Sequence, residues 1–263
     1  MRRCLLLAAL ALAFAPSAHA APAKHLTRIA PLTRIVFVTD GKAQAEHGGF
    51  YEALALGLYQ QRGLDVRIRE GGPGVNVPQL IAGGAADFGI ASDSFVPLDM
   101  VRERVPVRAV MAVFQKDLAI PMTQPRADVR RLADNGYSGY ANLVLVAQRW
   151  IDKKPAAVQA FYDATRDGWR HYLTGDPRPA NALIERANPE MSDAVIAQAI
   201  AKLKAYGLVL SGDAKPFGIG AMTDLRWKRF FDAASAEGLY PKNLDYHKAY
   251  DLSFMRGAPQ YFE

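Results

Sequence analysis

Three turns in the first part of the chain carry the side chains most able to bind a small molecule. They occupy residues 40–42, 71–76 and 92–94, and each follows a short apolar run that is typical of a strand. The carboxyl ends of parallel strands meet at one edge of a sheet, where open α/β folds bind their ligands. Helix N-termini at such an edge offer free N–H groups, and carboxylates there can accept hydrogen bonds from amino groups. The candidate ligand-binding residues are Asp40, Lys42, His47, Tyr51, Gly72, Pro73, Gly74, Asn76, Ser92, Asp93 and Ser94.

Each of these features also has a purely structural interpretation, which the sequence leaves open. The glycines of the second turn can relieve backbone strain at positive φ, and Asn76 can cap the helix that follows. The third turn can be a cluster of capping residues at a helix start. His47 can be a satisfied structural histidine. Phe50 and Tyr51 can supply an apolar pocket wall, although aromatic residues on a helix face are more often core residues.

Motifs of catalysis and of resident cofactors are missing from the sequence. It contains no GxSxG, HExxH or GxxxxGK[ST] motif, and no GxGxxG follows the first strand-like run. The only cysteine, Cys4, lies in the N-terminal leader, so the mature chain has no thiolate nucleophile and no disulfide. No two histidines have the spacing of a metal-ligand pair; after the leader they are His25, His47, His171 and His247. We therefore predict no catalytic residues, no metal site and no cofactor.

Residues 1–20 have the features of a secretory signal peptide. Arg2 and Arg3 form a basic start, residues 4–15 are apolar, and Ala18-His19-Ala20 is a small-x-small cleavage sequence. Cleavage is predicted after Ala20, with release of the mature chain into the periplasm. The formal charge of +6 and the pI of about 9.4 come from basic residues that are interrupted by acids. Because no basic stripe with interleaved aromatic residues exists, the sequence argues against nucleic-acid binding.

Strand-like and helix-like runs alternate at short spacing along the mature chain. This alternation favours an α/β fold with a mostly parallel sheet and right-handed βαβ connections. The expected strands cover residues 34–39, 64–68, 87–90, 107–114 and 143–146. The expected helices cover residues 48–61, 76–82, 94–103 and 155–173, with two more that begin after Ser192 and after Thr223 or Asp224.

Three segments of the chain resemble a known family of binding proteins. They are EHGGFYEALALGLYQQRGLDV from Glu46, GGPGVN from Gly71 and GGAADFGIASDS from Gly83, and they are similar to the SsuA/THI5-like (NMT1/THI5) family of ABC-transporter solute-binding proteins. The resemblance implies a periplasmic-binding-protein-like fold of two α/β lobes that hold a ligand between them. It also implies a monomer that delivers a small heterocycle, with a thiamine-precursor pyrimidine favoured, to an ABC permease in the inner membrane.

The sequence departs from the family pattern in two places. Gly41 stands where relatives usually have a tryptophan that can stack on a flat heterocycle. Between Gln115 and Leu143 there are too few residues for the βαβ series of a second lobe. We interpret this short interval as an internal deletion, which could be a biological variant, a decaying gene or a sequencing fault.

The predicted organisation follows from this deletion. Residues 1–20 are a signal peptide, 33–118 an intact first lobe with the ligand-site turns, 119–150 a truncated second lobe and hinge, and 151–263 a mainly helical region that packs on the lobes. Two alternatives to a binding protein stay open. One is an enzyme related to the thiamine pyrimidine synthases of the same family, although their cysteine-rich motif is absent. The other is a non-functional remnant.

Overall fold

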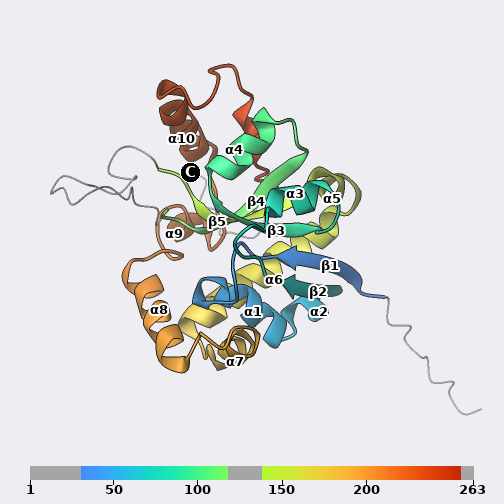
Figure 1. Cartoon of the computed structure of the whole chain (residues 1–263), viewed down its shortest axis with the longest axis vertical. Helices are drawn as coiled ribbons and strands as arrows, with labels where there is room; N and C mark the ends of the chain where they lie inside the picture. The colour runs from blue at the N-terminus through green and yellow to red at the C-terminus, as the bar shows by residue number, and fades with distance from the viewer. Residues whose placement is uncertain (1–30, 118–137, 256–263) are drawn as a thin grey trace, which may run out of the picture. The chain divides into compact units, whose positions relative to one another are not determined.

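The computed structural model describes residues 31–117 and 138–255, and the chain from Pro31 onward forms one compact unit. Its centre is a five-stranded sheet in the order β2-β1-β3-β5-β4 (Figure 1). The strands are β1 (Thr33–Val38), β2 (Leu64–Arg69), β3 (Phe88–Asp93), β4 (Val107–Phe114) and β5 (Ala141–Ala147). All five expected strands are therefore present. The signal-peptide prediction concerns residues outside the described part.

Four strands of the sheet run in one direction and β5 runs against them. β1 pairs in parallel with β2 and β3, whereas β5 pairs antiparallel with β3 on one side and β4 on the other. The prediction of a mostly parallel α/β sheet is confirmed. The strand that the sequence placed in the hinge region lies inside the same sheet, where all seven of its residues are buried.

The helices lie around this sheet. In Figure 1 the helices α4 and α10 lie at the top of the view, and α7 and α8 at the bottom. The short helices are a 3-10 turn η1 (Ala45–His47), α2 (Leu58–Gln61), α3 (Val77–Ala82), α5 (Gln148–Lys153), α9 (Ala214–Phe217) and a 3-10 turn η3 (Tyr246–Ala249). The longer ones are α1 (Gly48–Ala55), α4 (Phe95–Arg102), α6 (Pro155–Thr174), α7 (Arg178–Ala187), α8 (Asp193–Ala205) and α10 (Asp224–Ala236).

One expected helix, residues 48–61, is in fact two. Gly57 has a φ of 66° and separates α1 from α2, because the left-handed conformation cannot continue an α-helix. The expected capping residues are confirmed at the later helices. The side chain of Ser192 accepts a hydrogen bond from the Val195 amide, and Thr223 accepts one from the Arg226 amide.

Aromatic side chains fill the core between the sheet and α6. The Phe161 ring of α6 lies 5.2 Å from Phe37 and 4.9 Å from Phe88, and it stacks on Tyr59. Phe50 is fully buried with its ring 4.7 Å from Phe37. The idea that Phe50 forms a pocket wall is therefore wrong, because its ring faces the core.

Three glycines allow α1 and α6 to approach each other closely. A Cβ atom on Gly49 would lie 2.1 Å from the Trp169 ring, and one on Gly48 would lie 2.0 Å from the Tyr172 ring. On the facing helix, a Cβ on Gly168 would lie 2.3 Å from the Gly49 carbonyl oxygen. The paired glycines at the start of α1 thus have a packing role, since any side chain would push the helices apart.

Across residues 31–117 and 138–255, no helix combines the length and the apolar character needed to cross a membrane.

Candidate ligand site at the edge of the sheet

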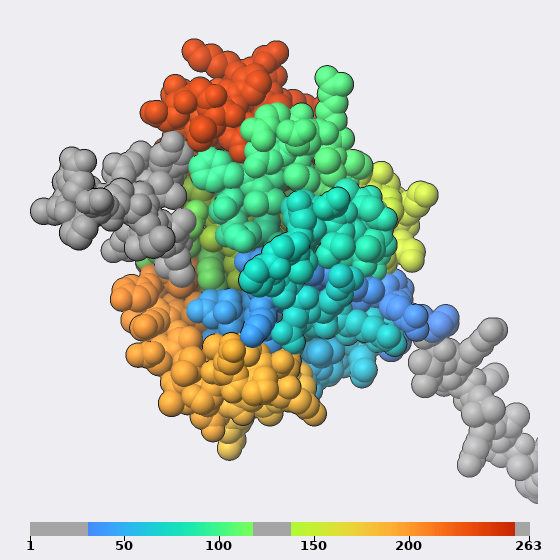
Figure 2. Space-filling view, in the orientation of Figure 1, coloured from blue at the N-terminus to red at the C-terminus, as the bar shows by residue number. Residues whose placement is uncertain are grey.

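Two adjoining hollows open at the edge of the sheet where β1 and β3 end. The smaller encloses about 260 Å³ and the larger about 590 Å³, and Asp40 and Ser92 line both. Because β5 is antiparallel, its first residues, Ala141 and Asn142, reach the same edge and line the smaller hollow. Figure 2 shows the face on which α3 and α4 (teal to green) lie, and the larger hollow is lined by the first turn of α3 and by one side of α4.

Asp40, His47 and Ser92 form a hydrogen-bonded unit at this edge. The Asp40 Oδ1 atom lies 2.9 Å from His47 Nε2, and the Ser92 hydroxyl donates to Asp40 Oδ2 at 3.1 Å. Burial raises the pKa of the Asp40 carboxyl, but the hydrogen bonds from His47 and Ser92 outweigh burial and hold this pKa below its ordinary value of 3.8. The carboxylate is therefore ionised at neutral pH and fixed in orientation by two donors.

The lowered pKa of Asp40 predicts a defined pH dependence of stability. The folded state binds the Asp40 proton more weakly than the unfolded state, so the stabilisation is complete above about pH 5 and is lost as pH falls below about 4. In urea titrations from pH 3 to pH 7, wild type should exceed Asp40→Asn in free energy of unfolding at neutral pH, and the difference should shrink in acid. Asp65→Asn, at the opposite edge of the sheet, is the control. A difference that stays constant with pH would contradict the assignment.

Asp93 and Ser94 make structural contacts at this edge. Asp93 Oδ1 accepts from the backbone amides of Phe95 at 2.9 Å and Val96 at 3.2 Å, so it caps α4. The Ser94 hydroxyl bonds both the amide and the carbonyl of Tyr140, at 2.7 and 3.0 Å, and is buried. The capping interpretation of this turn therefore holds for Asp93, whose side chain also lines the smaller hollow.

The other candidate residues divide between the hollows and their surroundings. Gly74 and Asn76 line the larger hollow, and Asn76 also caps α3 by accepting from the Gln79 amide at 3.0 Å. Lys42 is exposed and pairs with Glu190 at 3.3 Å. Tyr51 is buried in the core cluster. These two residues, together with Gly72 and Pro73, lie outside the sets that line the two hollows.

The structure adds lining residues that sequence reasoning missed. Gln44, Glu46, Phe114, Asp117 and Asn142 line the smaller hollow. Asn142 is the most informative of them, because it interrupts the apolar run of β5 and has a φ of 49°. Its Nδ2 atom donates to the Glu46 carbonyl at 2.9 Å and so ties β5 to the start of α1. A polar residue inside an apolar strand was the signal that could have found it.

The charge of the hollows is acidic. The ionisable lining residues within the described ranges are Asp40, Glu46, His47, Asp93, Asp99 and Asp117, with no lysine or arginine among them. Burial, together with the nearby Asp117 and Asp99 carboxylates, raises the pKa of Asp93. An edge of this kind offers acceptors to ligand N–H groups. In the described part of the chain, no three His, Cys, Asp or Glu side chains are placed to hold a metal ion.

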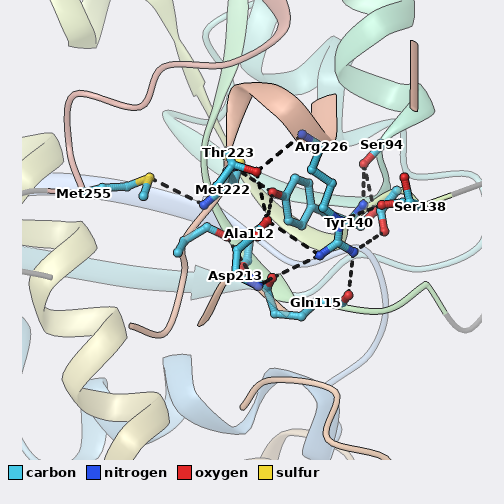
Figure 3. Close-up of polar contacts among 12 residues, drawn as sticks. Ser94, Ala112, Gln115, Ser138, Tyr140, Asp213, Met222, Thr223, Arg226 and Met255 are labelled. Carbon is cyan, nitrogen blue, oxygen red and sulfur yellow. Dashed lines mark hydrogen bonds and ion pairs between the residues drawn. The ribbon is translucent and has the colours of Figure 1, made fainter. Parts of the chain in front are cut away.

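A second polar cluster holds the adjoining ends of β4 and β5 (Figure 3). The Tyr140 hydroxyl donates to the Asp213 carboxylate and accepts from the Thr223 amide at 2.8 Å. Arg226 lies over the Tyr140 ring, 4.1 Å from its centre, and donates to the carbonyls of Gln115, Ser138 and Gly139. This cluster is a structural clamp, because its donors and acceptors are directed at one another.

Comparisons with known proteins agree with this fold. Residues 44–136 match a family model described as NMT1/THI5 like, which confirms the resemblance. The alkanesulfonate-binding protein SsuA from Xanthomonas axonopodis pv. citri, bound to MOPS, has a TM-score of 0.55 and 13% identity over 84% of this chain and 99% of that chain. A zinc-bound ligand-binding component of an ABC-type import system from Staphylococcus aureus gives 0.56 and 9% identity over 87% and 99%.

A third similar structure is described by its fold. A Candida albicans protein described as having the generic periplasmic binding protein fold gives a TM-score of 0.56 and 11% identity over 82% of this chain and 93% of that chain. No curated protein sequence matches the chain. The chain therefore has the α/β periplasmic-binding-protein fold, as the sequence predicted.

Proposed function

We propose that the chain is the periplasmic solute-binding component of an ABC importer, and that its ligand is a small heterocycle rich in N–H donors. The favoured ligand is a thiamine-precursor pyrimidine, and the partner is a permease in the inner membrane. The family-model match and the shared fold of ABC import components support the coarse part of this proposal. The acidic lining of the two hollows is the observation that favours a ligand rich in N–H donors.

The carboxylates favour donor-rich ligands over anionic ones. The fold relative from Xanthomonas binds alkanesulfonates, which are anions. At an effective dielectric constant of about 20, two like charges about 4 Å apart repel by roughly 4 kcal/mol. Asp40 is ionised at neutral pH and borders both hollows, so a sulfonate placed there would meet this repulsion. An aminopyrimidine instead presents N–H groups that carboxylates and amide oxygens accept.

One sheet edge supplies only part of a ligand's surroundings. The described residues contain one sheet, and it includes β5 of the predicted hinge. The remainder of the proposed truncated second lobe, residues 119–137, lies outside the described part. Sites that bind well bury most of the ligand surface. We therefore expect weaker binding than a complete two-lobed cleft would give, with electrostatic complementarity rather than enclosure setting the ligand preference.

The proposal is tested by calorimetry on the chain that begins at Ala21. The ligands are a hydroxymethyl-aminopyrimidine, ethanesulfonate and nitrate, each at low ionic strength. The aminopyrimidine should bind and the two anions should not. Asp40→Ala should weaken binding by about tenfold or more, because a hydrogen bond to a charged group is lost. Asp65→Ala, a carboxylate distant from both hollows, should bind as wild type does. Tighter binding of either anion than of the pyrimidine would refute the proposed ligand class.

A further inference from the structure

A hollow of about 620 Å³ lies at the edge of the sheet opposite the candidate ligand site. It is found where β4 begins and β5 ends, since its lining includes Val107, the first residue of β4, and Gln148, which directly follows β5. The rest of the lining comes from residues within 101–108 and within 241–248. The volume is typical of sites for small organic ligands. We call it the Arg104 hollow.

The lining of the Arg104 hollow has an excess of positive charge. Its ionisable side chains are those of Arg102, Arg104, Arg108, Asp245 and Lys248. Arg102 is neutralised by Asp99 at 3.0 Å and Glu103 at 3.2 Å, and Lys248 is neutralised by Asp245 at 3.5 Å. Arg104 and Arg108 pair with no carboxylate in residues 31–117 and 138–255. The hollow therefore has two uncompensated positive charges.

Arg108 is a cation in an otherwise apolar strand. It is the only charged residue of β4, whose other seven residues are buried, and it is itself half-buried. Its Nη1 atom donates to the Tyr250 carbonyl at 3.3 Å, which orients the guanidinium but does not neutralise it. A cation removed from water normally has an anionic partner, because desolvation otherwise disfavours the charge. An anion in the hollow would supply that partner.

Arg104 has a backbone conformation that normally belongs to glycine. Its φ is 58°, its amide donates to the Val101 carbonyl at 3.1 Å, and the Val105 amide donates to the Met100 carbonyl at 2.8 Å. This is the Schellman pattern that ends a helix, and Arg104 stands where glycine is usual. The helix dipole favours a cation here, but Arg102 already places one in the last turn of α4. Arg104 thus occupies this position at a conformational cost, as functional residues often do.

We propose that the Arg104 hollow binds a small organic dianion, whose two negative charges are neutralised by Arg104 and Arg108. A phosphate monoester and a dicarboxylate both have this chemistry, and guanidinium groups donate paired N–H bonds to either kind of oxygen. Val105, Pro106 and Leu244 of the lining can contact the carbon part of such a ligand. The hollow shares no lining residue with the two at the Asp40 edge, so a dianion can bind there whichever ligand that edge takes.

The test is calorimetry at pH 8 and low ionic strength on the chain that begins at Ala21. The probes are phenyl phosphate and phthalate, which are dianions at this pH, and benzoate, which is a monoanion. A dianion should bind at least about tenfold more tightly than benzoate, because it forms a further charge-assisted hydrogen bond. The tighter of the two dianions shows whether the charges are bound on one group or on two.

Two variants and one control assign the binding to the hollow. Arg104→Gly should weaken dianion binding at least about tenfold, while its thermal midpoint stays at or above that of wild type because glycine suits the positive φ. Arg108→Gln should weaken binding to a similar degree. Arg67→Gln removes an exposed arginine from β2, at the far side of the sheet from β4, and should bind as wild type does.

Several results would overturn this site. Wild type might bind neither dianion, or bind benzoate as tightly as the dianions, and either result would rule it out. Equal losses of affinity in Arg104→Gly and Arg67→Gln would show that only the net charge of the chain acts. Unchanged affinity in Arg104→Gly would refute the site even if Arg108→Gln fails to fold. None of these titrations uses the aminopyrimidine, so they leave the proposed function to its own test.

Discussion

Replacing Arg226 by methionine should lower the free energy of unfolding by about 3 kcal/mol or more. The Arg226 guanidinium donates to the Ser138 carbonyl at 2.6 Å, the Gln115 carbonyl at 2.6 Å and the Gly139 carbonyl at 2.9 Å. Methionine keeps the apolar stem but leaves these acceptors without their donor. Burial lowers the pKa of Arg226, and the nearby Tyr140 and Asp213 act against this effect.

The measurement for Arg226 is urea unfolding followed by circular dichroism. Arg226→Lys should be intermediate, because an ammonium keeps the charge but cannot reproduce the planar fork of donors. Arg229→Met is the matched control on the same helix, where the side chain is exposed, and should change stability by less than about 0.5 kcal/mol. Equal stability of Arg226→Met and Arg229→Met would show that the clamp contributes nothing to the fold.

Replacing Gly168 by alanine should lower the free energy of unfolding by about 2 kcal/mol or more. The added Cβ would lie 2.3 Å from the Gly49 carbonyl oxygen and 2.7 Å from the Ala53 Cβ atom. Both contacts are on α1, and one of them is backbone, so α1 and α6 would have to separate. Alanine has the better helix propensity by about 1 kcal/mol, which opposes the effect but is the smaller term.

Thermal and urea unfolding both measure the Gly168 effect. Gly41→Ala is the control, because a Cβ there meets only Gln44 Nε2 at 3.9 Å. It should stay within about 0.5 kcal/mol of wild type. Stability of Gly168→Ala at the wild-type level would mean that the two helices do not pack as described.

The sequence predicted the strands and most helix starts because those signals are local. Apolar β-rich runs mark β1 to β5, and Ser192 and Thr223 mark helix starts by residue type and position. The break at Gly57 was missed because an isolated glycine within a helical pattern can also be tolerated. Helix α7 was missed because only Ala180 and Ile184 of its ten residues are buried, too few for a clear period.

The candidate site was predictable only in part, since its assembly depends on strand order. The turns at Asp40, Asn76 and Ser92 do line one edge, as expected for strands of one direction. The place of β5 between β3 and β4 is a non-local pairing that no short motif encodes. Sequence reasoning therefore could not predict that Asn142 lies at this edge. The glycine pair before Phe50 turned out to serve helix packing rather than a ligand.

The most direct test of the central claim is a crystal structure of the mature chain with the hydroxymethyl-aminopyrimidine. We predict the ligand at the edge lined by Asp40, Ser92 and Asn142, with a ligand N–H group within hydrogen-bond distance of the Asp40 carboxylate. Another hollow, of about 620 Å³, lies at the opposite edge, and its lining includes Arg104 and Arg108. Ligand density in that hollow, with the Asp40 edge holding only solvent, would contradict the account.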